Sequence, residues 1–209
     1  EQELDALRDA GLLESIQPFW DPVLRFNRHL RVRLIMRLAK MCLVGFRLAI
    51  KGRVGLFCAG KKDGSLRLIV DGREPSSLHR RPPHSALGTP AAVASLDLSD
   101  QAFNDAGIDP KTAVPQGAGV DLRHGFHQFT NINMGSWFGM DFPECADVYD
   151  VDAVFCEELR VCIPVSRATV VFPVYEGLPM GWSWSLFFCQ EATASAQQEG
   201  VARSCGSSA

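Results

Sequence analysis

Apolar residues recur at helical spacing between residues 28 and 42. From Leu30 to Leu38 every fourth position is a leucine, which is the spacing of one face of an α-helix. Basic residues occupy the remaining positions, and Asp21-Pro22 supplies a cap and a first-turn proline upstream. The pattern predicts an amphipathic helix with its apolar face on a core. Its basic face could lie along nucleic acid or an anionic membrane, or simply face solvent.

Two apolar runs between residues 54 and 73 predict a β-hairpin. They are separated by Asp63-Gly64, a dipeptide that is typical of hairpin turns. Lys61 and Arg67 fall near this turn, where their charges could grip phosphate oxygens. Basic residues in this place could equally protect an edge strand from pairing with another chain.

Later in the chain, the β-branched residues 169–175 predict a strand, and the stretch from Ser183 to Ala196 predicts a helix. The Pro- and His-rich residues 76–89 predict a loop. A helix is also expected within residues 90–106. Its inward-facing residues would be Leu96, Leu98 and Phe103.

Three other stretches are less regular. Residues 109–119 predict a loop that leads into a strand ending near Asp121. Residues 1–17 carry scattered leucines among acids, which make a short amphipathic helix at best. Residues 131–167 have no readable pattern.

The charges are separated along the chain, although the net charge is only -3. Residues 22–62 contain eleven Lys or Arg and no acid, whereas residues 97–158 contain twelve Asp or Glu. A basic surface suits a polyphosphate backbone, and an acidic surface suits cations. Both surfaces could also simply be solvated, as most charged runs are.

Seven cysteines are present, and none forms a C-x-x-C pair. We expect small buried side chains or free thiols in a reducing compartment. No apolar run approaches the roughly 20 residues of a membrane span, and no secretory signal is visible. The sequence therefore predicts an intracellular protein, cytoplasmic or nuclear, with no membrane partner. Because the chain starts at Glu1 and ends in a small polar tail, we expect a fragment of a longer product.

The stretch Val120-Asp121-Leu122 ends a short apolar approach with a carboxylate, and Phe126 follows five residues after that acid. An acid at the end of a strand can hold a hard cation with its side chain, while the backbone carbonyl of Leu122 adds a second oxygen. An aspartate that caps a turn or a helix is the plainer interpretation of the same residue.

Three stretches, taken in order, resemble the reverse transcriptases of retroelements and retroviruses. They are the hairpin at 54–73, the stretch at 120–128, and Leu178-Pro179-Met180-Gly181-Trp182 with its flanking residues. They resemble the nucleotide-binding hairpin, the first catalytic motif and the primer-template motif, and the resemblance covers roughly residues 51 to 190. It implies an α+β fold made of partial polymerase fingers and palm, with helices packed on an antiparallel sheet. The implied segments are an N-terminal helix or tail (1–22), a basic helix and fingers hairpin (23–92) and an incomplete palm (93–209).

The resemblance also implies a role for each matching residue. Asp121 would be catalytic and would bind Mg²⁺, or Mn²⁺, together with the Leu122 carbonyl. The residues implied to bind deoxynucleoside triphosphates are Lys61, Arg67, Phe126, Met180 and Gly181. An RNA or DNA template-primer would contact Pro179 and Trp182, and from the basic helix Arg31, Arg33 and Arg37. Met180 stands where retroviral members carry a glutamine, so a hydrogen bond from that side chain is not carried over.

The third motif of the family, two adjacent aspartates after the Ser183 helix, is missing. The chain has no aspartate after Asp152, and Tyr149-Asp150-Val151-Asp152 has the wrong spacing and the wrong order. One carboxylate cannot hold the two ions that phosphoryl transfer uses. We therefore expect a fragment or a degenerate copy of the domain, whose synthesis would need a further C-terminal portion.

Two alternatives remain open. A non-catalytic nucleic-acid-binding remnant would keep the basic surface without the chemistry. A serine hydrolase is a remote alternative, because Gly181-Trp182-Ser183-Trp184-Ser185 approaches a G-x-S-x-G elbow. That motif lacks its last glycine here, and no histidine follows it in the chain.

Overall fold

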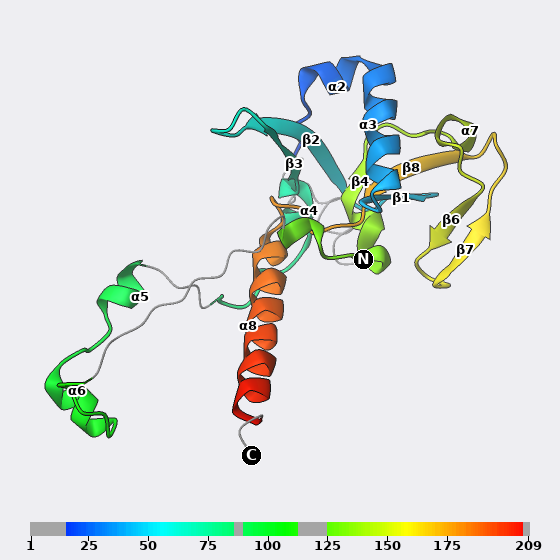
Figure 1. Cartoon of the computed structure of the whole chain (residues 1–209). Helices are drawn as coiled ribbons and strands as arrows, with labels where there is room; N and C mark the ends of the chain where they lie inside the picture. Colours follow the sequence, from blue (N-terminus) through cyan, green and yellow to red (C-terminus); the bar gives the residue numbers. More distant parts are fainter. Residues whose placement is uncertain (1–15, 86–89, 113–124, 207–209) are drawn as a thin grey trace. The chain divides into compact units, whose positions relative to one another are not determined.

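A computed structural model describes residues 16–85, 90–112 and 125–206. The chain divides into two units, one comprising Glu1–Pro83 with His124–Ala209 and the other His84–Arg123. The first unit contains a sheet and several helices, and the second contains two short helices (Figure 1). The strand expected to end near Asp121 lies outside the described residues.

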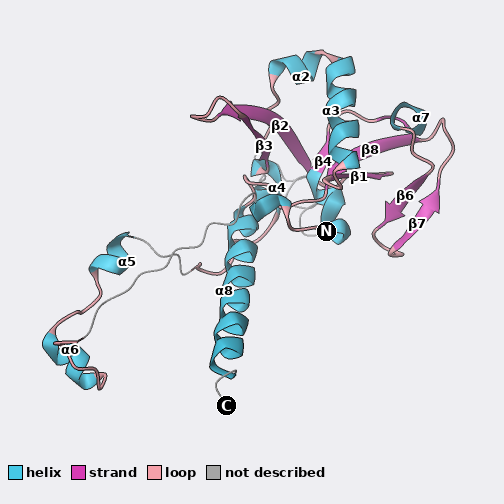
Figure 2. Cartoon of the chain, in the orientation of Figure 1, coloured by secondary structure: helices cyan, strands magenta, loops and turns pink. Residues whose placement is uncertain are grey.

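A six-stranded sheet organises the first unit, in the order β1-β8-β4-β2-β3 with β5 paired to β8 (Figure 2). Its strands are β1 (Val44–Arg47), β2 (Arg53–Gly60), β3 (Leu66–Asp71), β4 (Gly139–Met140), β5 (Glu144–Cys145) and β8 (Val170–Tyr175). The α+β class is therefore confirmed. The expectation of a purely antiparallel sheet was wrong, because β2 and β4 pair in parallel.

The predicted hairpin is confirmed as β2 and β3, which pair antiparallel from Gly55 opposite Asp71 to Gly60 opposite Leu66. Gly64 adopts a φ of 80°, a left-handed conformation that glycine tolerates best. Burial rises along β3 from its exposed first residues to the buried Val70 and Asp71. The hairpin thus has an exposed tip and a base inside the core.

The basic helical segment consists of α2 (Pro22–Phe26) and α3 (Arg28–Lys40). The Asp21 side chain caps α2, whose first residue is Pro22, and the Asn27 side chain caps α3. Ile35 and Leu38 of α3 belong to the same buried core as strand residues of β1, β2, β3 and β8. Leu34 is partly buried against this core, whereas Leu30 is 38 % exposed, so the predicted apolar face packs from Leu34 onward and not over its first turn.

Residues 131–167, which had no readable pattern, form several short elements. They are η2 (Ile132–Phe138), β4, β5, α7 (Ala146–Tyr149), β6 (Ala153–Cys156) and β7 (Val161–Pro164). β6 and β7 pair only with each other as a two-stranded sheet. Arg47 at the end of β1 joins this small sheet to the large one, because its guanidinium binds both Glu157 and Glu176 at 3.0 Å.

Two predictions between residues 73 and 106 need correction. The loop expected over 76–89 begins with α4 (Arg73–Leu78), since proline is tolerated in the first turn of a helix. The single helix expected over 90–106 is two helices, α5 (Pro90–Ala94) and α6 (Asp100–Asp105). Leu96 and Leu98 are exposed rather than inward-facing. The predicted strand over 169–175 and the helix from Ser183 are confirmed as β8 and as α8 (Ser183–Gly206).

The cysteines whose side chains the structure describes are free thiols. Cys42, Cys58, Cys145 and Cys162 are exposed, and Cys156 and Cys189 are partly buried. Among the helices within the described ranges, none is both long and apolar enough to cross a membrane.

Candidate nucleotide and nucleic-acid interface

The stretch between β8 and α8 contacts two segments that are distant in the sequence. The Leu178 N–H donates to the backbone oxygen of Phe126 at 3.1 Å, and the Gly181 N–H donates to that of Val70 at 3.3 Å. Phe126 lies in η1 (Gly125–His127), and Val70 lies at the base of the hairpin. The described parts of the three resembling stretches are therefore in direct backbone contact.

Gly72 and Gly181 permit this contact, because neither has a side chain. A Cβ atom on Gly181 would lie 2.8 Å from the Gly72 nitrogen, and one on Gly72 would lie 2.8 Å from the Trp182 nitrogen. The Ser76 hydroxyl of α4 lies 2.9 Å from the Gly72 oxygen and 3.1 Å from the Gly181 oxygen. It also accepts the Ser183 N–H at 3.0 Å. The base of the hairpin and the start of α8 are thus held together through backbone groups.

We expect Gly181→Ala to lower the free energy of unfolding by about 1–3 kcal/mol, because overpacking of this size forces backbone shifts. Denaturant unfolding followed by circular dichroism measures the change. Gly60→Ala is the matched control, since a Cβ there meets no atom within 4 Å. Gly60→Ala should be neutral or slightly stabilising. Equal effects of the two substitutions would contradict the close approach at Gly181.

The side chains of the Leu178–Trp182 stretch face mainly inward. Pro179 is fully buried, Trp182 is 3 % exposed, and the Trp182 ring packs against Phe138 at 5.0 Å between centroids. Gly181 is exposed and Met180 is half-buried. Pro179 and Trp182, implied to contact a template-primer, therefore hold this stretch in the core, while Met180 and Gly181 are accessible from outside.

The tip of the hairpin carries the implied phosphate-binding cations. Arg67 is exposed and stands opposite Ala59, and the Lys61 N–H donates to the Ser65 oxygen at 2.8 Å. Neither cation forms an ion pair with the residues that the structure describes. The Asp63 carboxylate accepts hydrogen bonds from the Ser65 hydroxyl and N–H, which lower the pKa of Asp63. Attraction to the nearby Lys61 also lowers the pKa of Asp63, although the two residues form no ion pair, so Arg67 is the more accessible of the two cations for an anionic ligand.

Phe126 is half-buried and packs against the core. His127 beside it shares a hydrogen bond of 2.5 Å with the Tyr175 hydroxyl at the end of β8. Burial raises the pKa of Tyr175, so this hydroxyl stays protonated at neutral pH. The Asn131 N–H donates to the backbone oxygen of Glu176 at 2.5 Å. The segment from Phe126 to Asn131 is therefore bound at both of its ends to the backbone that follows β8.

The implied metal site, Asp121 with the Leu122 carbonyl, lies outside the described residues. Within residues 16–85, 90–112 and 125–206, no three His, Cys, Asp or Glu side chains form a group that could hold a metal ion. The Mg²⁺ or Mn²⁺ expectation remains a prediction.

The basic face of α3 differs from the expected set in one residue. Arg31 was expected on the surface but is 7 % exposed, and its guanidinium donates to the oxygens of Leu24 and Arg25 at 2.9 Å. That guanidinium also lies 3.9 Å from the centre of the Phe142 ring, and burial lowers the pKa of Arg31. Arg31 thus joins α2 to α3 instead of facing a ligand.

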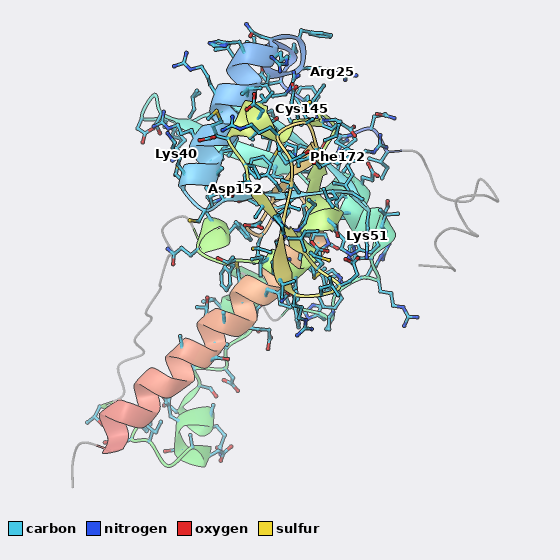
Figure 3. The ribbon with its side chains drawn as sticks, turned by 90° about the vertical axis from the view of Figure 1, so that its right-hand side faces the viewer. Arg25, Lys40, Lys51, Cys145, Asp152 and Phe172 are labelled. Carbon is cyan, nitrogen blue, oxygen red and sulfur yellow. The ribbon has the colours of Figure 1, made fainter. Side chains whose placement is uncertain are left out.

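Arg28 at the start of α3 is exposed but pairs with Glu144. The other exposed cations of α3 are Arg33, Arg37 and Lys40, which we call the α3 basic stripe. They are spaced by four and three residues, so they lie along one side of the helix. None of the three pairs with a carboxylate of the described residues. Figure 3 labels Lys40, the last residue of α3, and Arg25, which lies in the preceding helix α2; both helices are drawn in blue. Lys40 was not among the expected contacts, although its three-residue spacing from Arg37 would have indicated it.

No protein-family model matches the chain, and a comparison with curated proteins finds no match.

Proposed function

We propose that the chain is a part, or a degenerate copy, of a reverse-transcriptase-type nucleotidyltransferase domain that binds nucleic acid and deoxynucleoside triphosphates. The contact among the hairpin base, Phe126 and Leu178–Gly181 carries this proposal. A triphosphate must be gripped, a sugar must be stacked and a base pair must be supported within the span of one nucleotide. Segments that serve these tasks have to meet, and these three do.

The free cations support the same proposal. Lys61 and Arg67 lie near the exposed hairpin tip, where a phosphate can replace water around them. The α3 basic stripe offers three further cations that can contact a sugar-phosphate backbone. Asp121 would supply a carboxylate for Mg²⁺ or Mn²⁺, as the resemblance implies.

Neutralising the hairpin tip should weaken nucleotide binding. We expect Lys61→Gln with Arg67→Gln to reduce the affinity for a Mg²⁺-bound deoxynucleoside triphosphate roughly tenfold or more, because hydrogen bonds to charged groups are removed. Titration calorimetry measures this affinity. Lys111→Gln, which removes an exposed cation from the other unit, is the control. Unchanged affinity in the double variant would reject these two residues as phosphate ligands.

Residues 1–209 should bind a primer-template without extending it. A single candidate carboxylate leaves most of the charge of the transition state uncompensated, and electrostatic stabilisation is usually the largest catalytic contribution. Primer extension with Mg²⁺ and deoxynucleotides tests synthesis, and fluorescence anisotropy tests binding. Asp121→Asn should weaken Mg²⁺-dependent nucleotide binding and leave nucleic-acid binding unchanged. Robust extension by this chain would show that another carboxylate set is present.

The same measurements distinguish the proposed function from the alternative of a non-catalytic nucleic-acid-binding remnant. Such a protein would bind the primer-template with the same salt dependence, but Mg²⁺ and deoxynucleotides would not change that binding. Binding of neither ligand would reject the proposed function.

A further inference from the structure

The beginning of α8 carries a group of aromatic side chains that the proposed nucleotide site does not use. Trp184 and Phe188 are one helical turn apart, with ring centroids 5.6 Å apart and an interplanar angle of 29°. Phe187 contacts both rings at 5.5 and 5.7 Å. Phe188 is 40 % exposed, so part of this surface is open to solvent. We call Trp184, Phe187 and Phe188 the α8 aromatic surface.

Interior groups hold this surface in place. Trp182 is buried. The centroid of its ring lies 5.9 Å from that of Phe188 and 5.5 Å from that of His79. The Trp184 indole N–H donates to the Arg80 oxygen at 2.6 Å, which ties the helix to the segment after α4. Because the rings are already ordered, a ligand that stacks on them loses little additional side-chain entropy.

Two exposed arginines lie in the segment whose backbone contacts Trp184. Arg80 and Arg81 are exposed, and neither forms an ion pair with the part of the chain that the structure describes. Arg80 is also the residue whose oxygen binds Trp184. The first acid of α8 is Glu191, which follows the rings along the helix and so marks the far boundary of the surface. Aromatic faces next to unpaired arginines are the combination that proteins use for stacked bases and their phosphates.

We propose that the α8 aromatic surface, with Arg80 and Arg81, binds single-stranded nucleic acid by stacking bases on Trp184 and Phe188. This rests on the proposed function, which makes nucleic acid the partner of the chain. A single strand is specified because its bases expose their faces, whereas the bases of a duplex are stacked on one another. The arginines bind the adjoining phosphates, a contact that an uncharged partner such as a neutral peptide cannot make.

The test uses a fluorescein-labelled single-stranded 20-mer of DNA, its RNA equivalent and the matching blunt duplex. Trp184→Leu and Phe188→Leu keep an apolar side chain but remove the aromatic ring. Each should weaken single-strand binding about tenfold in fluorescence anisotropy, since one base can no longer stack, and should leave duplex binding unchanged. Phe188→Trp should retain binding. Quenching of tryptophan fluorescence by the single strand should fall in Trp184→Leu.

Leu186→Ala is the control, because Leu186 is 45 % exposed on the same helix but has no ring. It should bind the single strand like the parent chain. Single-strand affinity that is the same in Trp184→Leu, Phe188→Leu and the parent would overturn the inference, as would an equal loss in Leu186→Ala. Thermal unfolding checks that each variant is folded. If the leucine variants are not, Arg80→Gln with Arg81→Gln leaves the rings in place and should still weaken single-strand binding, and unchanged affinity in that variant would overturn the inference.

The two proposals fail differently. If the chain binds duplex and nucleotides but its single-strand affinity does not depend on the aromatic rings, only the proposal for the α8 aromatic surface is rejected. Ring-dependent single-strand binding without any nucleotide binding would reject the reverse-transcriptase assignment and keep the aromatic surface.

Discussion

Replacing Arg47 with methionine should lower the free energy of unfolding by about 3–5 kcal/mol, which is the effect of removing one partner from a buried ion pair. The Arg47 side chain is 4 % exposed and binds Glu157 and Glu176, whose side chains are 10 % and 13 % exposed. Its guanidinium also donates to the oxygen of Ile132 at 2.7 Å. Methionine fills a similar volume but leaves two carboxylates without their cation and two backbone carbonyls, those of Phe46 and Ile132, without their donor. Urea unfolding followed by circular dichroism measures the change.

Arg28→Met is the matched control for this experiment. Arg28 also forms a bidentate ion pair, in which its guanidinium nitrogens lie 2.7 and 2.9 Å from the two carboxylate oxygens of Glu144. The Arg28 side chain, however, is 60 % exposed. Exposed pairs of this kind contribute little to stability, because solvent screens the charges, so Arg28→Met should change the free energy of unfolding much less than Arg47→Met. Adding Glu157→Gln and Glu176→Gln to Arg47→Met should recover part of the lost stability, because the uncompensated charges are removed. Similar losses in Arg28→Met and Arg47→Met would show that burial does not distinguish the two pairs.

Neutralising the α3 basic stripe should reduce both the affinity for nucleic acid and its salt dependence. For Arg33→Gln, Arg37→Gln and Lys40→Gln together, we expect the slope of log K against log salt to fall by about 0.9 for each duplex phosphate that is no longer neutralised. At low salt the affinity should fall by roughly 10- to 1,000-fold, since several kcal/mol of electrostatic attraction are removed. Fluorescence anisotropy titrations between low and physiological salt give both quantities.

Arg31→Gln provides the contrast, because the Arg31 guanidinium is used inside the protein. It should lower stability and leave the salt slope unchanged in the fraction that remains folded. A slope that is the same in the triple variant and in the parent would assign the stripe to a solvated face. A slope that falls in Arg31→Gln would mean that the buried arginine reaches the ligand.

The elements that were predicted from the sequence are those whose signal is local. The α3 periodicity, the turn at Asp63-Gly64 and the β-branched run of β8 each determine their structure within a few residues. Strands β4 and β5 have two residues each, and their pairing depends on partners far away in the chain. A two-residue strand has no period, so only tertiary contacts can specify it.

One feature that was not predicted, the burial of Arg31, did have a signal in the sequence. Arg31 precedes Ile35 and Leu38 by four and seven residues, which places it on the apolar side of α3. The burial of Arg31 was therefore readable from the spacing. The meeting of Gly72 and Gly181 was not, because the two glycines are brought together only by the pairing of the whole sheet. The resemblance predicted that the two stretches act on one ligand, but it did not predict that their backbones touch.

The stretch from Leu178 to Trp182 contributes to folding as well as to the proposed site. Pro179 and Trp182 are buried, and Gly181 touches Gly72 through backbone atoms, so most of this stretch is required for folding. A systematic substitution library scored only for the amount of protein in cells should therefore show low tolerance at these positions. Intolerance there would arise from protein quality control, with no selection for polymerase activity.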